Sequence, residues 1–144
     1  MRGILIDTEC WLWWHLCPER LGKAAMALLE ERRSPLLLSA ASSWEIAIKQ
    51  ALGKLELPAP PERFVPEQMA EDGIEPLPIE HAHALRVARL PPHHSDPFDR
   101  LLVAQAQLER CSLLTADTQL FDYDADLVWA GRQSPPRPRR RRRS

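Results

Sequence analysis

Long apolar runs and cysteine-based patterns are both missing from this sequence of 144 residues. It contains no run of roughly 18 consecutive apolar residues, so it predicts no membrane-spanning helix. The first apolar run, over 3–6, meets the acid Asp7 too early to form the core of a signal peptide. We therefore expect a cytoplasmic protein that has no membrane partner.

Cysteine is scarce, and its spacing does not match the usual cysteine-based sites. Cys10, Cys17 and Cys111 are odd in number and lack the paired spacing of zinc ligands. Cys10 and Cys17 are seven residues apart, in a segment whose pattern predicts one apolar helix face. We expect reduced core residues and no disulfide framework.

Basic residues are also scarce in most of the chain. The net charge is −1, but six of the 19 basic residues are arginines among the last eight positions. These are Arg137, Arg139, Arg140, Arg141, Arg142 and Arg143. The rest of the chain holds 13 basic and 20 acidic residues, a net charge of about −7. Because phosphate attracts positive surface, this acidic body suits a nucleic-acid enzyme only if acids gather around a metal that supplies positive charge.

The apolar pattern of the chain ends near residue 132. From Gln133 onward the sequence is rich in proline and arginine and has no apolar periodicity, which predicts a disordered tail over 133–144. One folded domain is expected over 1–132, a usual length for a single domain. The arginines of the tail could bind RNA weakly and nonspecifically.

Short apolar runs alternate with amphipathic segments along the body of the chain. Strands are predicted over 3–6, 36–38, 74–77, 112–115 and 127–129. Helices are predicted over 9–17, 22–33, from Ser42 or Ser43 onward, and over 61–72, 80–89 and 98–109. Strands that alternate with helices favour an α/β fold, in which a parallel sheet is sandwiched between helices.

Four acids occupy positions that such a sheet would bring together. Asp7 ends the first strand, and Asp117 lies just past the strand over 112–115. Open parallel sheets bind ligands at the carboxyl ends of strands, near the point where the strand order reverses. Glu45 and Asp99 lie in the first turns of two helices that could face the same crevice. We therefore predict one shared acidic site.

The neighbours of Glu45 and Asp99 favour metal binding at this site. Trp44 and Ile46 flank Glu45, and Leu101 follows Asp99 closely. A buried, unpaired carboxylate is costly, and metal coordination is a usual remedy. Carboxylates without cysteine or clustered histidine suit Mg²⁺ and Mn²⁺. Several carboxylates around such ions are a common apparatus for hydrolysing phosphodiesters.

Each acid also has a simpler interpretation. Asp7 could cap a strand end, and Asp117 could cap a short helix that begins at Thr118. Glu45 could pair with Lys49 one helical turn away, for only ~0.3–0.5 kcal/mol. Asp99 could be a first-turn acid favoured by the helix dipole by about 0.3–1 kcal/mol. A shared site is favoured because all four coincidences would otherwise have to occur at one end of the sheet.

Histidine and tryptophan give weaker signals. His93 and His94 are adjacent on a proline-rich loop without a nearby cysteine, so a solvated loop is favoured over a zinc site. His81 and His83 fall near a predicted helix start and are expected to face solvent. Three tryptophans of the first predicted helix are expected in the core or at a dimer surface, and base stacking is less favoured. These are Trp11, Trp13 and Trp14.

Several segments, taken in order, resemble one known family. They are 4–8 (ILIDT), 39–49 (SAASSWEIAIK), 52–55 (LGKL), 90–106 and 114–117 (LTAD). Each segment is a weak signal alone. Together they closely resemble PIN-domain proteins, specifically the VapC-type toxins of bacterial toxin–antitoxin pairs. The resemblance covers about 1–129.

This resemblance implies a fold, an activity and a site. The fold would be a PIN-like three-layer α/β/α sandwich with a central parallel sheet. The activity would be that of an endoribonuclease that hydrolyses RNA phosphodiester bonds through water activated by Mg²⁺ or Mn²⁺. Asp7, Asp99 and Asp117 would hold the metal, and Glu45 would bind metal or orient the attacking water.

The resemblance also implies supporting residues and partners. Thr8 and Thr115 would support the metal shell through their hydroxyls. Asp96, three residues before Asp99, is a second-rank contributor. The partners would be an RNA substrate, a cognate antitoxin that blocks the site, and a second copy of the chain in a homodimer.

Three other classes of protein share some of these features. A phosphatase of the haloacid dehalogenase type also starts from an Asp after a strand, but Glu9 stands where its second Asp is needed. A PIN-fold nuclease of RNA processing is harder to separate from a toxin. A non-catalytic RNA- or protein-binding module is disfavoured because all four acids are present.

Overall fold

The computed structural model describes residues 3–136, so the tail arginines expected to bind RNA lie outside the described residues. The strands are β1 (Ile4–Ile6), β2 (Leu36–Ser39), β3 (Glu75–Leu77), β4 (Ser112–Thr115) and β5 (Leu127–Trp129). The α-helices are α1 (Thr8–Leu16), α2 (Lys23–Glu31), α3 (Ala40–Ala51), α4 (Pro61–Asp72), α5 (His81–Val87) and α6 (Pro97–Glu109). Two short 3₁₀ helices are η1 (Pro18–Arg20) and η2 (Thr118–Asp122). Within 3–136, every helix is too short or too polar to span a lipid bilayer.

The strands form one parallel sheet, as the sequence predicted, and the order of its strands is β3-β2-β1-β4-β5. β1 lies in the middle, where Ile4 pairs in register with Leu36 of β2 on one side and Ser112 of β4 on the other. The order of strands therefore reverses between β1 and β4. Asp7 and Asp117 follow these two strands, so they flank the switch point at which open parallel sheets bind ligands.

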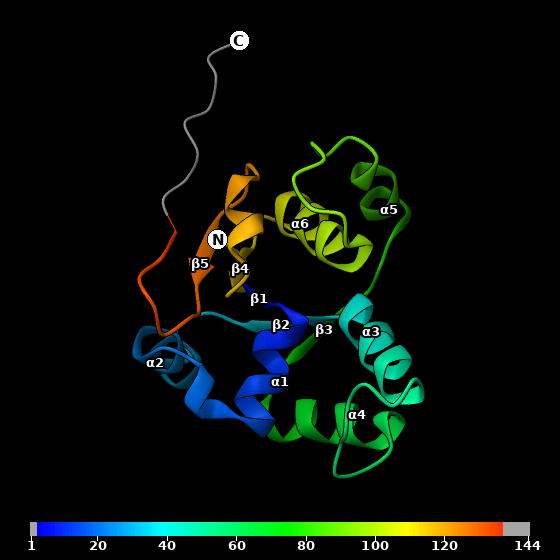
Figure 1. The fold of residues 1–144 in the computed structure, drawn as a ribbon, viewed down its shortest axis with the longest axis vertical. Coiled ribbons are helices and arrows are strands. Elements are labelled where there is room, and N and C mark those ends of the chain that lie inside the picture. Colours follow the sequence, from blue (N-terminus) through cyan, green and yellow to red (C-terminus); the bar gives the residue numbers. More distant parts are fainter. Residues whose placement is uncertain (1–2, 137–144) are drawn as a thin grey trace.

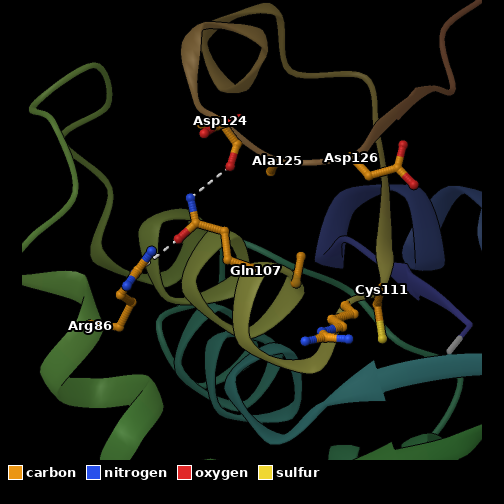
Figure 2. Close-up of a pocket in the computed structure, with 8 residues that line it drawn as sticks. Arg86, Gln107, Cys111, Asp124, Ala125 and Asp126 are labelled. Carbon is orange, nitrogen blue, oxygen red and sulfur yellow. Dashed lines mark hydrogen bonds between the residues drawn. The ribbon is translucent and has the colours of Figure 1, made fainter. Parts of the chain in front are cut away.

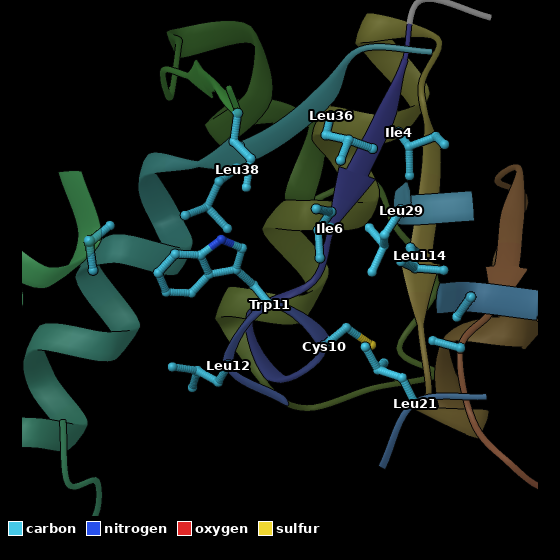
Figure 3. Close-up of a cluster of buried hydrophobic side chains, with 14 of the residues drawn as sticks. Ile4, Ile6, Cys10, Trp11, Leu12, Leu21, Leu29, Leu36, Leu38 and Leu114 are labelled. Carbon is cyan, nitrogen blue, oxygen red and sulfur yellow. The ribbon is translucent and has the colours of Figure 1, made fainter. Parts of the chain in front are cut away.

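Alternate residues of β1 face opposite layers of helices. Ile4 and Ile6 pack into a hydrophobic cluster that contains Trp11 of α1 and Leu29 of α2 (Figure 3). Leu5 packs into a second cluster, which is formed largely by α6. In Figure 1, α1, α2 and α4 lie on one side of the sheet, and α5 and α6 lie on the other. The expected α/β/α sandwich is confirmed.

Two expectations about helix ends were wrong. Helix α3 begins before Ser42, because Ser39 is its N-cap and accepts a hydrogen bond from the backbone N–H of Ala41 at 3.0 Å. Ser42 lies inside the helix, where it is buried and accepts the hydroxyl of Thr8 at 2.9 Å. Cys17, expected on the apolar face of the first helix, is instead the C-cap that ends α1.

Candidate metal centre

Asp7 is held at the end of β1 by two hydrogen bonds. Its Oδ1 accepts the backbone N–H of Cys10 at 2.7 Å, so Asp7 is the N-cap of α1. Its Oδ2 accepts the hydroxyl of Thr115 at 2.5 Å. Burial raises the pKa of Asp7 to about 6, although the hydrogen bonds from Thr115 and Cys10 oppose that rise. The carboxylate is thus fixed in place yet costly to ionise in the absence of a cation.

Thr115 joins the ends of β1 and β4. Its hydroxyl donates to Asp7 and accepts the backbone N–H of Asp117 at 3.0 Å, so one side chain positions both acids. Thr8, the other threonine expected to support the site, donates its hydroxyl to Ser42 and not to a carboxylate. In the structure Thr8 therefore fastens α1 to α3, and only Thr115 contacts an acid of the site directly.

Asp99 is the electrostatic centre of the acidic group. It lies in the first turn of α6, whose N-cap Asp96 accepts the backbone N–H of Phe98 at 2.8 Å. Burial, together with the charges of four neighbouring carboxylates, raises the pKa of Asp99 to about 8. These neighbours are Asp96, Asp7, Glu45 and Asp117. All four acids predicted from the sequence therefore share one region.

Glu45 lies on α3, and only one of its two carboxylate oxygens has a partner among the described residues. The residue is buried, and its Oε2 lies 2.9 Å from Nζ of Lys49 in the expected helical pair. Burial lowers the pKa of Lys49, but the hydrogen bond and charge of Glu45 outweigh it and leave that pKa raised. The other oxygen, Oε1, is buried and has no hydrogen-bond partner among the described residues. An unpaired buried carboxylate oxygen is costly and marks a position where a cation or a water would be stabilising.

His94 completes the group, and the expectation that it belongs to a solvated loop was wrong. Its side chain is only 11% exposed, and Nε2 lies 2.7 Å from Oδ2 of Asp117 and 3.3 Å from Oδ2 of Asp99. Nδ1 accepts the backbone N–H of Asp96 at 3.0 Å, so a proton on the ring must sit on Nε2, facing the acids.

The loop that carries His94 is held by Arg100. Its guanidinium donates to four backbone carbonyls at 2.9–3.3 Å. They belong to Val87, Leu90, Pro91 and His94. Two partners of the His94 ring are Asp99 of α6 and Asp117, which lies two residues past β4. Spacing in the sequence gives no signal for such contacts.

These residues fit a divalent cation. Ligand atoms of His94, Asp99 and Asp117 lie within 4.8 Å of one another. Asp7 and Glu45 add two buried carboxylates whose charge is felt at Asp99. Carboxylate oxygens of this kind suit Mg²⁺ and Mn²⁺.

Two hollows border Asp117 on the surface. One, of about 650 Å³, is lined by His94 and Gln119 among others. The second, of about 440 Å³, is lined by Ala116 and Thr118, the two chain neighbours of Asp117. The acidic group therefore has open space beside it in which a substrate could lie.

A third hollow, of about 480 Å³, lies at the amino ends of β4 and β5, where Cys111 and Asp126 precede the strands (Figure 2). Its polar groups hydrogen-bond one another: Gln107 accepts from Nε of Arg86 at 3.1 Å and donates to the carbonyl of Asp124 at 2.8 Å. It opens at the edge of the sheet opposite the acids, so it is not part of the acidic group.

The fold and this site define a class: parallel α/β sandwiches that gather carboxylates at the switch point of the sheet. Residues 4–126 match the family model of the PIN domain, and the chain belongs to this family. A stretch of 57 residues is 49% identical to Ribonuclease VapC16 of Mycobacterium tuberculosis. That match spans 40% of this chain and 40% of VapC16.

Solved structures share the fold. The VapBC2 complex from Rickettsia felis, bound to a DNA fragment from its promoter, has a TM-score of 0.65 at 12% identity, covering 88% of this chain and 98% of that chain. A toxin–antitoxin complex from Klebsiella pneumoniae has a TM-score of 0.58 at 20% identity, covering 88% and 96%. At such identities the likeness shows the fold alone, and it agrees with the expected PIN-like sandwich.

Proposed function

We propose that this protein is an endoribonuclease that depends on Mg²⁺ or Mn²⁺. The observation that carries the proposal is the gathering of carboxylates at the switch point of the sheet, where side-chain atoms of His94, Asp99 and Asp117 lie within 4.8 Å of one another and one buried oxygen of Glu45 has no partner among the described residues. Burial and the surrounding carboxylates accordingly raise the pKa of Asp99 to about 8. So much uncompensated negative charge in one place is stabilised by a divalent cation. Membership of the PIN domain family and the partial likeness to a ribonuclease support RNA as the substrate.

Each acid has a proposed role. Asp7, Asp99 and Asp117 would hold the metal, with Thr115 fixing the first and last of them. When bound, a divalent ion supplies positive charge against the phosphate and acidifies the attacking water. Glu45 would bind metal or orient that water through Oε1, while Lys49 holds its other oxygen.

Two further residues would tune the site. His94 can hold a proton on Nε2 beside Asp99 and Asp117, close to where charge develops on a cleaved phosphodiester. The negative charge of Asp96 raises the pKa of Asp99, and its side chain caps α6. We therefore assign Asp96 as a positioning residue and not as a ligand.

The proposed cellular role is that of the toxin in a toxin–antitoxin pair. The likeness to VapC16, and structural neighbours that are VapBC and toxin–antitoxin complexes, support this role. A cognate antitoxin that covers the acidic group and a homodimeric toxin complete the proposal. An RNA substrate would place the activity in the cytoplasm.

Cleavage of a folded tRNA pool tests the proposed function. Purified protein is incubated with Mg²⁺, Mn²⁺ or EDTA, beside the variants Asp7→Asn and Glu67→Gln. Glu67 is an exposed acid on α4, so its substitution is a matched control for loss of one carboxylate. We expect discrete cuts with metal that vanish in EDTA and in Asp7→Asn but persist in Glu67→Gln. Intact RNA with both metals, or unchanged cutting by Asp7→Asn, would contradict the proposal.

A further inference from the structure

The hollow of about 440 Å³ beside Asp117 has aromatic walls and basic rims. Trp13 of α1 and Trp129 at the end of β5 line it, together with Arg20 and Arg132. Its volume falls within the roughly 300–1,000 Å³ of ordinary ligand pockets. The hollow lies at the carboxyl ends of the strands, as the acids do. Trp129, the last residue of β5, pairs in register with Thr115, whose hydroxyl binds Asp7.

Trp129 is held as a fixed aromatic surface. Its ring packs edge-on against Phe121, with centroids 5.6 Å apart, and its indole N–H donates to the carbonyl of Gln133 at 2.7 Å. A Cβ at Gly131 would lie 2.6 Å from the indole ring, so only glycine leaves room for the ring over the backbone at that point. The polar atom of the indole is satisfied and the ring face is positioned before any ligand arrives.

The two arginines of this hollow form no ion pair among the described residues, although the acid Glu19 also lines the hollow. The guanidinium of Arg20 lies over the ring of Trp13, 5.8 Å from its centroid, and Arg132 donates to the backbone carbonyl of Glu19 at 3.1 Å. Neither forms an ion pair with an acid in the part of the chain that the structure describes. Near the acids, by contrast, Lys49 is already paired with Glu45. The hollow is therefore a place beside the acids where positive charge is available to a phosphate.

We infer that this hollow binds one nucleotide of the RNA substrate next to the cleaved phosphodiester. A base would stack on Trp13 or Trp129, and an adjacent phosphate would lie against Arg20 and Arg132. Aromatic faces combined with arginine are the usual means of binding unpaired bases. The arginines also offset the repulsion that the acidic body exerts on the RNA backbone. The inference rests on the proposed function, because it takes RNA as the substrate.

The structure also separates the tryptophans that the sequence could not distinguish. Trp11 is fully buried in the core. The ring of Trp14 stacks on His15, and the guanidinium of Arg32 lies over it, 5.6 Å from the centroid of the Trp14 ring. Trp13 alone among these three lines the hollow. Trp14 with Arg32 is thus a matched control for Trp13 with Arg20. Both tryptophans lie on α1 and each has a guanidinium over its ring, but Trp14 and Arg32 do not line the hollow.

Equilibrium binding of a labelled single-stranded RNA 12-mer of mixed sequence tests the inference. Fluorescence anisotropy in EDTA keeps the RNA intact, and each variant's circular dichroism and melting confirm that it folds. Stacking of one base is worth a roughly 5–150-fold change in affinity. We expect Trp13→Leu to weaken binding about tenfold or more, Trp13→Phe to restore most of it, and Trp14→Leu to leave it within about twofold.

The arginines provide a second, structurally mild test. Arg20→Gln should weaken RNA binding several-fold, and less so as salt rises, because the contact is electrostatic. Arg32→Gln should not. If Trp13→Leu and Arg20→Gln both bind the RNA as tightly as the wild type does, the inference is overturned. So would variants that bind RNA normally but lose an antitoxin, since the hollow would then be a protein-binding site.

Cleavage separates this inference from the proposed function. If the wild type cuts RNA with metal and Trp13→Leu does so with unchanged KM, the hollow does not bind substrate although the nuclease stands. If RNA binding depends on Trp13 and Arg20 but no metal supports cutting, the hollow is upheld and the proposed activity fails.

Discussion

Two clusters of one histidine and two carboxylates lie at opposite ends of α6, and they differ in how far the protein itself compensates their charges. The first is Glu80, His83 and Glu109, and the second is His94, Asp99 and Asp117. Ligand atoms in each lie within 4.8 Å of one another. By composition alone they are equivalent.

The cluster around His83 serves packing. His83 is 1% exposed; Nδ1 accepts the backbone N–H of Glu80 at 3.0 Å and Nε2 lies 2.9 Å from Oε1 of Glu109. Gln105 lies beside the same ring and donates to the carbonyl of Pro78 at 3.2 Å. Both nitrogens of this imidazole are engaged, as those of His94 are, and here they fasten α5 to α6.

The cluster around His94 instead accumulates charge. Asp7, Glu45 and Asp96 add their negative charges to the two carboxylates, and together with burial they raise the pKa of Asp99 to about 8. One oxygen of Glu45 has no partner among the described residues. A metal centre is therefore marked by carboxylates that the protein leaves uncompensated at a ligand-binding edge of the sheet, and not by ligand-type residues alone.

The sharpest test of this comparison removes one carboxylate from each cluster and measures Mn²⁺ binding by calorimetry. Asp99→Asn should lower the affinity by more than the roughly 10–100-fold that loss of a supporting hydrogen bond costs. Glu109→Gln should change it less than about twofold, because that cluster holds no metal. Equal losses in the two variants would show that both clusters bind metal and that accumulated charge does not distinguish them.

A smaller effect is expected from the threonine that positions two acids. Thr115→Val keeps the shape but removes the hydroxyl that donates to Asp7 and accepts from Asp117. We expect RNA cleavage and Mn²⁺ affinity to fall roughly 10–100-fold while the sheet stays folded. Thr8→Val is the control, because its hydroxyl contacts Ser42 and no acid. If both substitutions reduce Mn²⁺ affinity alike, Thr115 acts through packing and not through its hydrogen bonds.

The acids could be predicted from the sequence because each lies beside a chain element with a clear pattern. The simpler interpretations were also true, and they do not compete with a shared site because a carboxylate has two oxygens. Asp117 caps η2 through Oδ1, which accepts the backbone N–H of Gln119 at 2.9 Å, while Oδ2 contacts His94. Asp7 divides its oxygens in the same way between Cys10 and Thr115.

The histidines could not be placed with the same success, and the reason differs between them. His94 meets Asp117 across 23 residues, and only the folded chain shows this contact. His83, expected to face solvent, is buried, and here a signal was present. His83, Val87 and Leu90 follow the i, i+4, i+7 spacing of one helix face, and Leu90 lies in the core. The polar character of histidine concealed an apolar position.

A further effect is expected on stability, and its sign follows from the raised pKa values. In the folded protein the pKa is about 6 for Asp7 and about 8 for Asp99, whereas an unfolded Asp titrates near 4. Between roughly pH 4 and 8 the folded state therefore binds more protons than the unfolded state. Without metal, stability is greatest below pH 4 with respect to these groups and is lost as pH rises towards 8.

Thermal melting between pH 5 and 8 in EDTA measures this loss, at roughly 2–4 °C for each kcal/mol. Asp99→Asn should flatten the dependence, because its amide does not ionise, whereas Glu109→Gln should keep it. Adding Mn²⁺ should raise the melting temperature more at pH 8 than at pH 6, because the metal binds the carboxylates only in their ionised form. A wild-type melting temperature that is constant over this range, or an equal effect of Mn²⁺ at both pH values, would mean that the charges around Asp99 are compensated within the protein itself. The distinction between the two histidine clusters would then fail.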